Sequence, residues 1–311
     1  MALPFKLLYT DAYDLNLGEH VFPAVKYRLI RDRLLAEGVA EPADFVTPEP
    51  ASDEDLLRVH TEGWVNGLKN GTLSAMQILT LEIPYSKEMV RAVWLSAGGS
   101  IAAARLALRD GIGFNIGGGF HHAFANHGEG FCAINDVAVA IRCLQDESAG
   151  SQKIKRALVV DLDVHQGNGT AAIFHGDPTV FTFSMHQYNN YPAEKPPSDL
   201  DVHLPDGIGD EEYLAELAEK LPPALAEFQP DLVFYVAGAD PYVDDQLGGL
   251  RLTLEGLQRR DNYVFKAARR HDMPVAVALA GGYARNVGDT VRIHANTAIE
   301  ARNVLREAAA A

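Results

Sequence analysis

Short runs of apolar residues, many of them β-branched or aromatic, recur along this chain and are separated by longer segments. The clearest runs lie at 112–116, 157–162, 179–185, 232–236 and 274–280. Several are apolar throughout, which is typical of strands covered on both faces rather than on one. The pattern therefore predicts a buried and mostly parallel sheet.

The segments between these runs have the apolar spacing of amphipathic helices. They lie at 24–37, 86–109, 135–147, 210–228, 253–270 and 287–309, with a shorter helix at 62–70. Ser52, Asn135 and Thr253 are candidate N-caps, and Gly71 follows the short helix as a candidate C-cap. Strands that alternate with helices predict an α/β fold. Because no internal repeat or long linker interrupts the pattern, we expect one domain over residues 1–311.

The composition is that of a globular protein and adds one constraint through its charge. The 311 residues are 47% hydrophobic and 22% charged, and the formal net charge is −15. Without a dense basic cluster, such a chain is not expected to bind nucleic acid. An acidic field attracts amines and cationic peptides, but an acidic balance also serves solubility, so the charge leaves both interpretations open.

Two cysteines, Cys132 and Cys143, exclude a disulfide framework and a cysteine-rich zinc site. The apolar stretch 1–9 is interrupted by Pro4 and Lys6 and lacks the features of a signal peptide. No segment has the roughly 18 consecutive apolar residues of a membrane span. We therefore expect a cytoplasmic protein with no membrane span, and we find no pattern that sets an oligomeric state.

Polar and glycine-rich residues follow four of the predicted strands. The residues concerned are His121 and His122 after three glycines, the Asp161–His165 run, Asp240, and Tyr283 after Gly281 and Gly282. In an open parallel sheet, ligands bind beyond the carboxyl ends of the strands. We therefore expect these residues to meet at one edge of the sheet and to form the site there.

Asp161, Asp163 and His165 alternate with Leu and Val at a strand end, so their side chains share one face. Two carboxylates and an imidazole buried together need a cation or hydrogen-bond partners. For Asp163 and His165, metal binding and a buried Asp–His hydrogen bond are both possible. Asp161, which lies just inside the strand, is better placed to orient a histidine or to bind a monovalent cation.

The other candidates also have a functional and a purely structural interpretation. Adjacent histidines at 121 and 122 favour general acid–base chemistry over core packing. Asp240 is the expected third metal ligand, which would leave a fourth position open, whereas Asp244 and Asp245 are expected to be solvated. Tyr283 either packs in the core or donates a hydrogen bond to a developing oxyanion.

Taken in order, these motifs resemble the histone deacetylase family of the arginase-deacetylase fold, over roughly residues 9–299. The family's motifs are recognised here as GGGFHHA at 117–123, GFC at 130–132, DLDVHQGNGT at 161–170, AGAD at 237–240 and GGY at 281–283. Asn168 and the segments around 185–189 and 247–261 are most like the class IV branch and its bacterial homologues. The resemblance implies a three-layer fold with the active site at the carboxyl ends of the strands.

The resemblance also implies a role for each residue of the motifs. Zinc would be held by Asp163, His165 and Asp240, although the same ligands accept ferrous iron. His122 would act as general base and then as acid, with Asn168 as its neutral partner, and His121 would be oriented by Asp161. Tyr283 would polarise the scissile carbonyl. A structural potassium ion would be held by Asp161, Ser184 and Met185, with main-chain oxygens of Asp163 and His165. The walls of the substrate channel would be Gly130, Phe131 and Tyr191.

The implied activity is that of a zinc-dependent amidohydrolase, which removes acetyl or longer acyl groups from acyl-lysine or related acylated amines through a metal-activated water. One alternative is a deacylase of acetylpolyamines or small metabolites on the same fold. Another is a binding module for acyl-lysine without turnover. A dimanganese ureohydrolase would need a second set of bridging carboxylates, and the spacing from Asp240 to Asp244 does not supply it.

Overall fold

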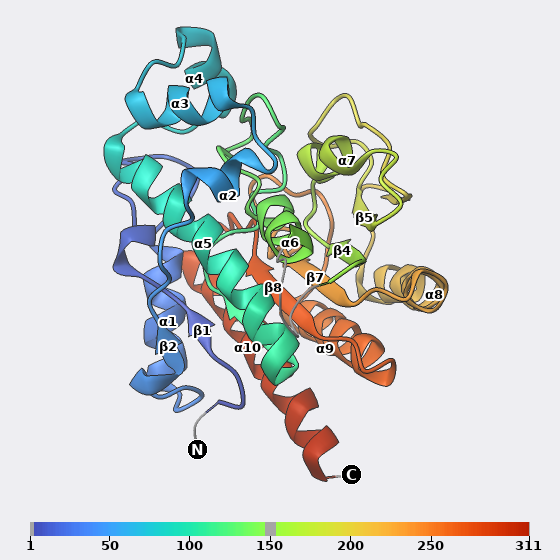
Figure 1. Ribbon diagram of the computed structural model, residues 1–311. Helices are drawn as coiled ribbons and strands as arrows, with labels where there is room; N and C mark the ends of the chain where they lie inside the picture. Colours follow the sequence, from blue (N-terminus) through green and yellow to red (C-terminus); the bar gives the residue numbers. More distant parts are fainter. Residues whose placement is uncertain (1–2, 147–153, 311) are drawn as a thin grey trace.

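The computed structural model describes residues 3–146 and 154–310. Within these ranges, eight strands form one sheet in the order β2-β1-β3-β8-β7-β4-β5-β6 (Figure 1). All neighbouring strands are parallel. The strands are β1 (Leu7–Leu8), β2 (Phe45–Val46), β3 (Ile112–Asn115), β4 (Ala157–Asp161), β5 (Val180–Gln187), β6 (Leu200–Leu204), β7 (Leu232–Ala237) and β8 (Val275–Leu279).

Helices cover both faces of this sheet, so the molecule has three layers (Figure 1). One face carries α1 (Lys26–Ala36), α8 (Asp210–Phe228), α9 (Leu254–Arg270) and α10 (Val287–Ala310). The opposite face carries α5 (Lys87–Asp110), α6 (Asp136–Asp146) and α7 (Asn168–Phe174), and α3 (Glu62–Asn70) packs against α5 beyond the sheet. The remaining helices are the short α2 (Asp53–Leu57) and α4 (Ala75–Leu81), with 3-10 turns at Asp11–Tyr13 and Pro42–Asp44.

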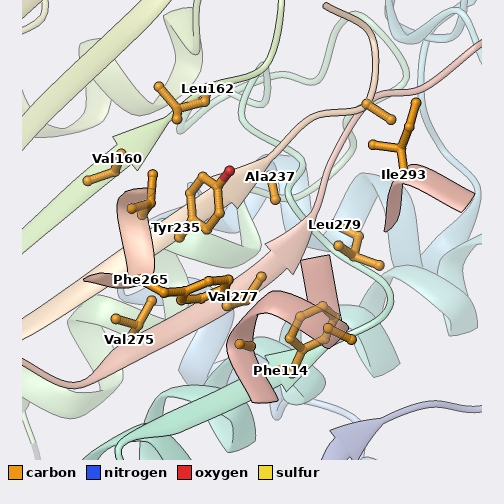
Figure 2. Close-up of a cluster of buried hydrophobic side chains, with 14 of the residues drawn as sticks. Phe114, Val160, Leu162, Tyr235, Ala237, Phe265, Val275, Val277, Leu279 and Ile293 are labelled. Atoms are coloured by element: carbon orange, nitrogen blue, oxygen red, sulfur yellow. The ribbon is translucent and has the colours of Figure 1, made fainter. Parts of the chain in front are cut away.

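Successive residues of the central strands enter different cores, because side chains alternate across a strand. On β7, Tyr235 packs with α9 while Phe234 packs on the α5 side, and both are fully buried. Figure 2 shows the first of these cores, where Tyr235 and Phe265 lie with their ring centroids 5.9 Å apart beside Val277. Burial on both faces explains why these strands are apolar throughout.

The sequence predicted the α/β class, the parallel sheet and the long elements correctly. The five predicted strands correspond to β3, β4, β5, β7 and β8, and each predicted helix is present to within a few residues. Residue 147, the expected end of α6, lies outside the described residues. Asn135 Oδ1 accepts the Ala138 N–H at 2.9 Å, and Gly71 has the left-handed conformation (φ +68°) of a helix C-cap. None of the described helices is both long and apolar enough to cross a lipid bilayer.

Candidate active site and metal centre

The polar residues singled out in the sequence lie together beyond four neighbouring strands. His122 follows β3, Tyr283 follows β8, Asp240 follows β7 and His165 follows β4, and these strands are adjacent in the sheet. All four side chains are at most 7% exposed. The parallel topology thus brings residues from four distant segments to one edge, as expected.

Asp163, His165 and Asp240 form a buried cluster whose candidate ligand atoms all lie within 4.8 Å of one another. His165 Nδ1 is 2.9 Å from Asp163 Oδ1 and 3.4 Å from Asp240 Oδ2. Backbone N–H groups orient both carboxylates: Gly281 N–H donates to Asp163 Oδ2 (2.8 Å) and Val164 N–H donates to Asp240 Oδ1 (2.8 Å). A side chain at position 281 would overlap Asp240 Oδ2, so this close approach requires glycine.

The charges of this cluster favour a cation. Burial raises the pKa of Asp240, with a further contribution from the Asp163 carboxylate, to about 7. Burial lowers the pKa of His165, but the adjacent Asp163 and Asp240 carboxylates outweigh that effect and raise it to about 10. Asp240 Oδ2 is buried and has no hydrogen-bond partner among the described residues. Because a metal ion competes with protons for such ligands, the donor set fits a divalent cation in place of bound protons.

The two adjacent histidines have partners of opposite kinds. His121 Nδ1 lies 2.6 Å from Asp161 Oδ2, whereas His122 Nδ1 lies 2.7 Å from Asn168 Oδ1. Burial lowers the pKa of His121, but Asp161 and Asp163 outweigh it and raise the value to about 9. Burial, together with the neighbouring His121 and His165, holds the pKa of His122 well below its usual range. These shifts favour a protonated His121 beside a neutral His122.

Tyr283 is buried at the same edge, and the carboxylate of Asp245 holds its backbone in place. Its N–H donates to Asp245 Oδ2 at 2.6 Å, and Asp245 Oδ1 accepts the N–H groups of Leu247 and Gly248. The expectation that Asp245 is solvated is therefore wrong, because three backbone donors compensate its burial. Asp244 is exposed beside Arg285, as expected. Burial raises the pKa of Tyr283 well above its usual value, so the phenol stays protonated and can donate.

The expected channel residues lie around His122 and Tyr283. The Phe131 ring centroid is 5.9 Å from that of Tyr283, and the Tyr191 ring centroid is 4.9 Å from that of His122. Tyr191 is 37% exposed and so lies toward the surface. Gly130 has φ +50°, and a Cβ there would lie 2.8 Å from His122 Cδ2.

The residues expected around potassium lie on two adjacent strands. Asp161 at the end of β4 is directly opposite Ser184 on β5, and Met185 is the next residue of β5. Asp161 Oδ1 also accepts the Asp163 N–H at 3.1 Å. The structure thus places Asp161 beside Ser184 and Met185 on neighbouring strands.

Two further residues of this site had no signal in the sequence. Lys26 on α1 is fully buried, and its Nζ donates to the carbonyl oxygen of Ala280 at 2.7 Å, next to the Gly281–Tyr283 turn. Burial lowers the pKa of Lys26 to about 8. Glu129 accepts a hydrogen bond from Asn168 Nδ2 at 2.6 Å. A lysine in a helix and a glutamate in a loop both resemble ordinary surface residues.

Comparison with known proteins agrees with this geometry. Residues 20–298 match the histone deacetylase domain. An uncharacterized protein of Picosynechococcus sp. is 43% identical over 301 residues, which cover 96% of this chain and 99% of that protein. Histone deacetylase 2 of Arabidopsis thaliana is 33% identical, with 92% of this chain and 77% of that protein covered.

A more distant relative and a solved structure extend the same result. A probable deacetylase of Archaeoglobus fulgidus is 31% identical, with 81% of this chain and 73% of that protein covered. The crystal structure of the HDA15 HD domain matches with a TM-score of 0.77 over 97% of this chain and 96% of that one, at 24% identity, which is a likeness of fold. The fold is therefore the arginase-deacetylase fold, and family and fold together support a deacetylase hydrolase. This chain belongs to the histone deacetylase family.

Proposed function

We propose that this protein is a zinc-dependent deacylase that removes acetyl or longer acyl groups from acyl-lysine or related acylated amines. The observation that carries the proposal is the buried Asp163–His165–Asp240 cluster with its unpartnered Asp240 oxygen, flanked by a neutral His122 and a protonated Tyr283. We further infer that residues 1–311 form a single catalytic domain, of which 1–2, 147–153 and 311 lie outside the described residues.

The three proposed ligands suit zinc and would leave its fourth coordination position open for water or substrate. Three protein ligands are the usual number at a catalytic zinc site, where the fourth position takes water or substrate. Ferrous iron accepts the same ligands, so metal content has to be measured. A structural potassium ion would be held by Asp161, Ser184 and Met185, with main-chain oxygens of Asp163 and His165.

The chemistry divides among the residues of the site. When bound, zinc would supply a Lewis acid that polarises the acyl carbonyl and lowers the pKa of a water. A carbonyl oxygen only accepts hydrogen bonds, so His122 must donate Nδ1–H to Asn168 and keep the lone pair on Nε2. His122 Nε2 can then take a proton from water and later deliver it to the departing amine. His121, paired with Asp161, supplies positive charge beside it.

Tyr283 and the channel residues complete the reaction site. The phenol of Tyr283 donates to the oxygen of the acyl group as negative charge develops there. Phe131 and Tyr191 would enclose the stem of the substrate, with Gly130 making room beside His122. A binding module without turnover has no need of both proton-transfer groups and the cluster, which is why we favour an enzyme.

The test is a substrate panel on protein with measured zinc content. Lysine peptides that carry acyl groups of increasing length would be compared with acetylpolyamines, which test the alternative of a polyamine or small-metabolite deacylase. Tyr283→Phe should lower kcat by about 10²- to 10³-fold, because one oxyanion donor is lost. If zinc-loaded protein cleaves nothing in the panel, the proposal is wrong. Two divalent transition-metal ions in each active site would instead indicate a ureohydrolase-like site.

A further inference from the structure

Glu129 lies between the buried site and the surface, and one of its oxygens joins two residues of the site. Glu129 Oε1 accepts a hydrogen bond from Asn168 Nδ2 at 2.6 Å and another from the Tyr191 hydroxyl at 2.6 Å. Its other oxygen lies 3.4 Å from His127 Nε2. The Glu129 side chain is 18% exposed: its contact with Asn168 is partly buried, whereas its contacts with Tyr191 and His127 lie toward the surface.

The first contact decides how the Asn168 amide is oriented. An amide has an accepting oxygen on one side and a donating nitrogen on the other, whereas a carboxylate only accepts. Asn168 must therefore turn its nitrogen toward Glu129, which leaves its oxygen facing His122 Nδ1 at 2.7 Å. A reversed amide would place the Asn168 oxygen beside the Glu129 carboxylate, where neither group can donate. The charge-assisted hydrogen bond between the two side chains would then be lost.

The amide orientation in turn selects the tautomer of His122. An oxygen beside Nδ1 requires the proton on Nδ1 and leaves the lone pair on Nε2. A reversed amide would place its N–H groups beside Nδ1 and favour the tautomer with a protonated Nε2, which cannot accept a proton from water. Asn168 is 2% exposed, so bulk water does not replace its partners easily.

The second contact connects the channel wall to the same pair. The Tyr191 ring stands edge-on to His122, with centroids 4.9 Å apart and planes at 87°. Its hydroxyl donates a hydrogen bond to Glu129 Oε1, the oxygen that also accepts from Asn168 Nδ2. One carboxylate oxygen thus restrains the base on two sides, through its hydrogen-bond partner and through the ring packed against it.

We propose that Glu129 is a positioning residue that acts through Asn168 to hold His122 in the tautomer able to accept a proton, and through Tyr191 to hold the channel wall against that imidazole. The proposal rests on the proposed function, in which His122 is the base.

The first variants remove the carboxylate. Glu129→Leu should lower kcat by about tenfold to hundredfold, with zinc content kept, as for other residues that orient a reacting group. KM should change by less than about threefold, because the substrate contacts are kept. Glu194→Leu is the matched control, since Glu194 is exposed in the same surface groove, and it should leave kcat unchanged.

A swap of the two groups separates positioning from a general loss of packing. Asn168→Asp alone would place a second carboxylate opposite that of Glu129. The two would repel each other and neither could donate, so activity should be lost. Asn168→Asp combined with Glu129→Gln restores a donor opposite an acceptor, so kcat should return to within about fivefold of wild type. The carboxylate would then lie directly against His122 and raise its pKa, which moves the acid limb of the kcat/KM profile to higher pH. If Glu129→Leu does not fold, the double variant is the deciding test. A kcat of Asn168→Asp/Glu129→Gln no higher than that of Asn168→Asp alone would overturn the proposal.

Nitrogen-15 NMR of the zinc-loaded protein reads the tautomer without turnover, with His122→Gln to assign the signal. Wild type should show His122 protonated on Nδ1, and Glu129→Leu should show a mixture or the other tautomer. Wild-type protein protonated on Nε2, or a Glu129→Leu variant with wild-type kcat, would overturn the proposal. An inactive wild-type protein would instead count against the proposed function alone.

Discussion

The middle of the sheet and its carboxyl edge are equally buried but have opposite chemistry. In the middle, Phe234 and Val277 pack among apolar side chains, and the backbone polar groups are satisfied by neighbouring strands. At the edge, Asp163 and Asp240 lie side by side, and burial raises the pKa of Asp240 to about 7. Burying like charges costs free energy that the apolar middle must offset. Stability and chemistry are thus assigned to different positions along the same strands.

The largest expected effect is at the edge. Asp240→Asn keeps the shape of the ligand and the acceptor for the Val164 N–H, but it removes a negative charge. We expect zinc binding to be lost and kcat/KM to fall on the order of 10⁴-fold. The metal-free variant should have a higher free energy of unfolding than metal-free wild type, because the pKa of wild-type Asp240 is raised from 3.8 to about 7: the difference develops between these pH values and is complete above pH 7.

Metal analysis, steady-state kinetics and urea denaturation above pH 7 check this expectation. Asp161→Asn is the control, because Asp161 orients His121 rather than contacting the metal; it should keep zinc and slow turnover by about tenfold to hundredfold. Equal zinc loss in the two variants would show that the division between ligand and orienting carboxylate is wrong.

The reverse result is expected in the middle of the sheet. Phe234→Ala removes a fully buried ring from β7 and should lower the free energy of unfolding by about 3–5 kcal/mol. Zinc content and kcat of the protein that remains folded should stay near wild type. Urea denaturation and kinetics at low temperature measure the two quantities. A drop in zinc content larger than the fraction unfolded would show that the two regions are not independent.

His60 tests whether burial alone, away from the metal cluster, makes a titratable group costly. Its Nδ1 contacts the Phe124 carbonyl oxygen and its Nε2 accepts the Asn135 N–H, both at 3.0 Å. Burial lowers the pKa of His60 to about 4. The unfolded chain binds this proton below about pH 6.5 and the folded chain only near pH 4. The free energy of unfolding should therefore fall as the pH falls through this window, by up to about 3 kcal/mol for this group.

The check is the pH dependence of urea denaturation between pH 7 and 4. His60→Gln should show a shallower decline than wild type, whereas His175→Gln, at an exposed position, should keep the wild-type slope. An unchanged slope in His60→Gln would mean that its burial does not control acid stability.

The sequence predicts the interior elements well because their pattern is long. The helices of several turns show a clear 3.6-residue periodicity, and the apolar runs between them are recognised as buried strands by their short length and their β-branched and aromatic residues. β1 and β2 have two residues each and cannot show any periodicity. β6 alternates apolar residues with Asp201 and His203 inside a long irregular segment, as an edge strand with one covered side does. These three strands were missed.

The site residues that follow strands are predictable because topology brings strand ends together. The residues that support these site residues are not predictable, because they contact partners far away in the sequence and belong to no recognisable motif. Lys26 meets a carbonyl 254 positions later, and Glu129 meets Asn168 39 positions later. Asp245 lies in a polar loop like a solvated residue, and only the three N–H donors that converge on it explain its burial.

The strand order also constrains how the chain is made. β8 lies between β3 and β7, and among the strands of residues 3–146 and 154–310 it alone joins β2-β1-β3 to β7-β4-β5-β6. The strands of both halves precede residue 275 along the chain, so until β8 is added β3 and β7 would each present an unpaired edge. The last strand to appear closes the gap and brings in Tyr283 with it. A chain that lacks β8 would carry the proposed metal ligands in one half and the histidine pair in the other, so the proposed site would form only once β8 joins the two halves.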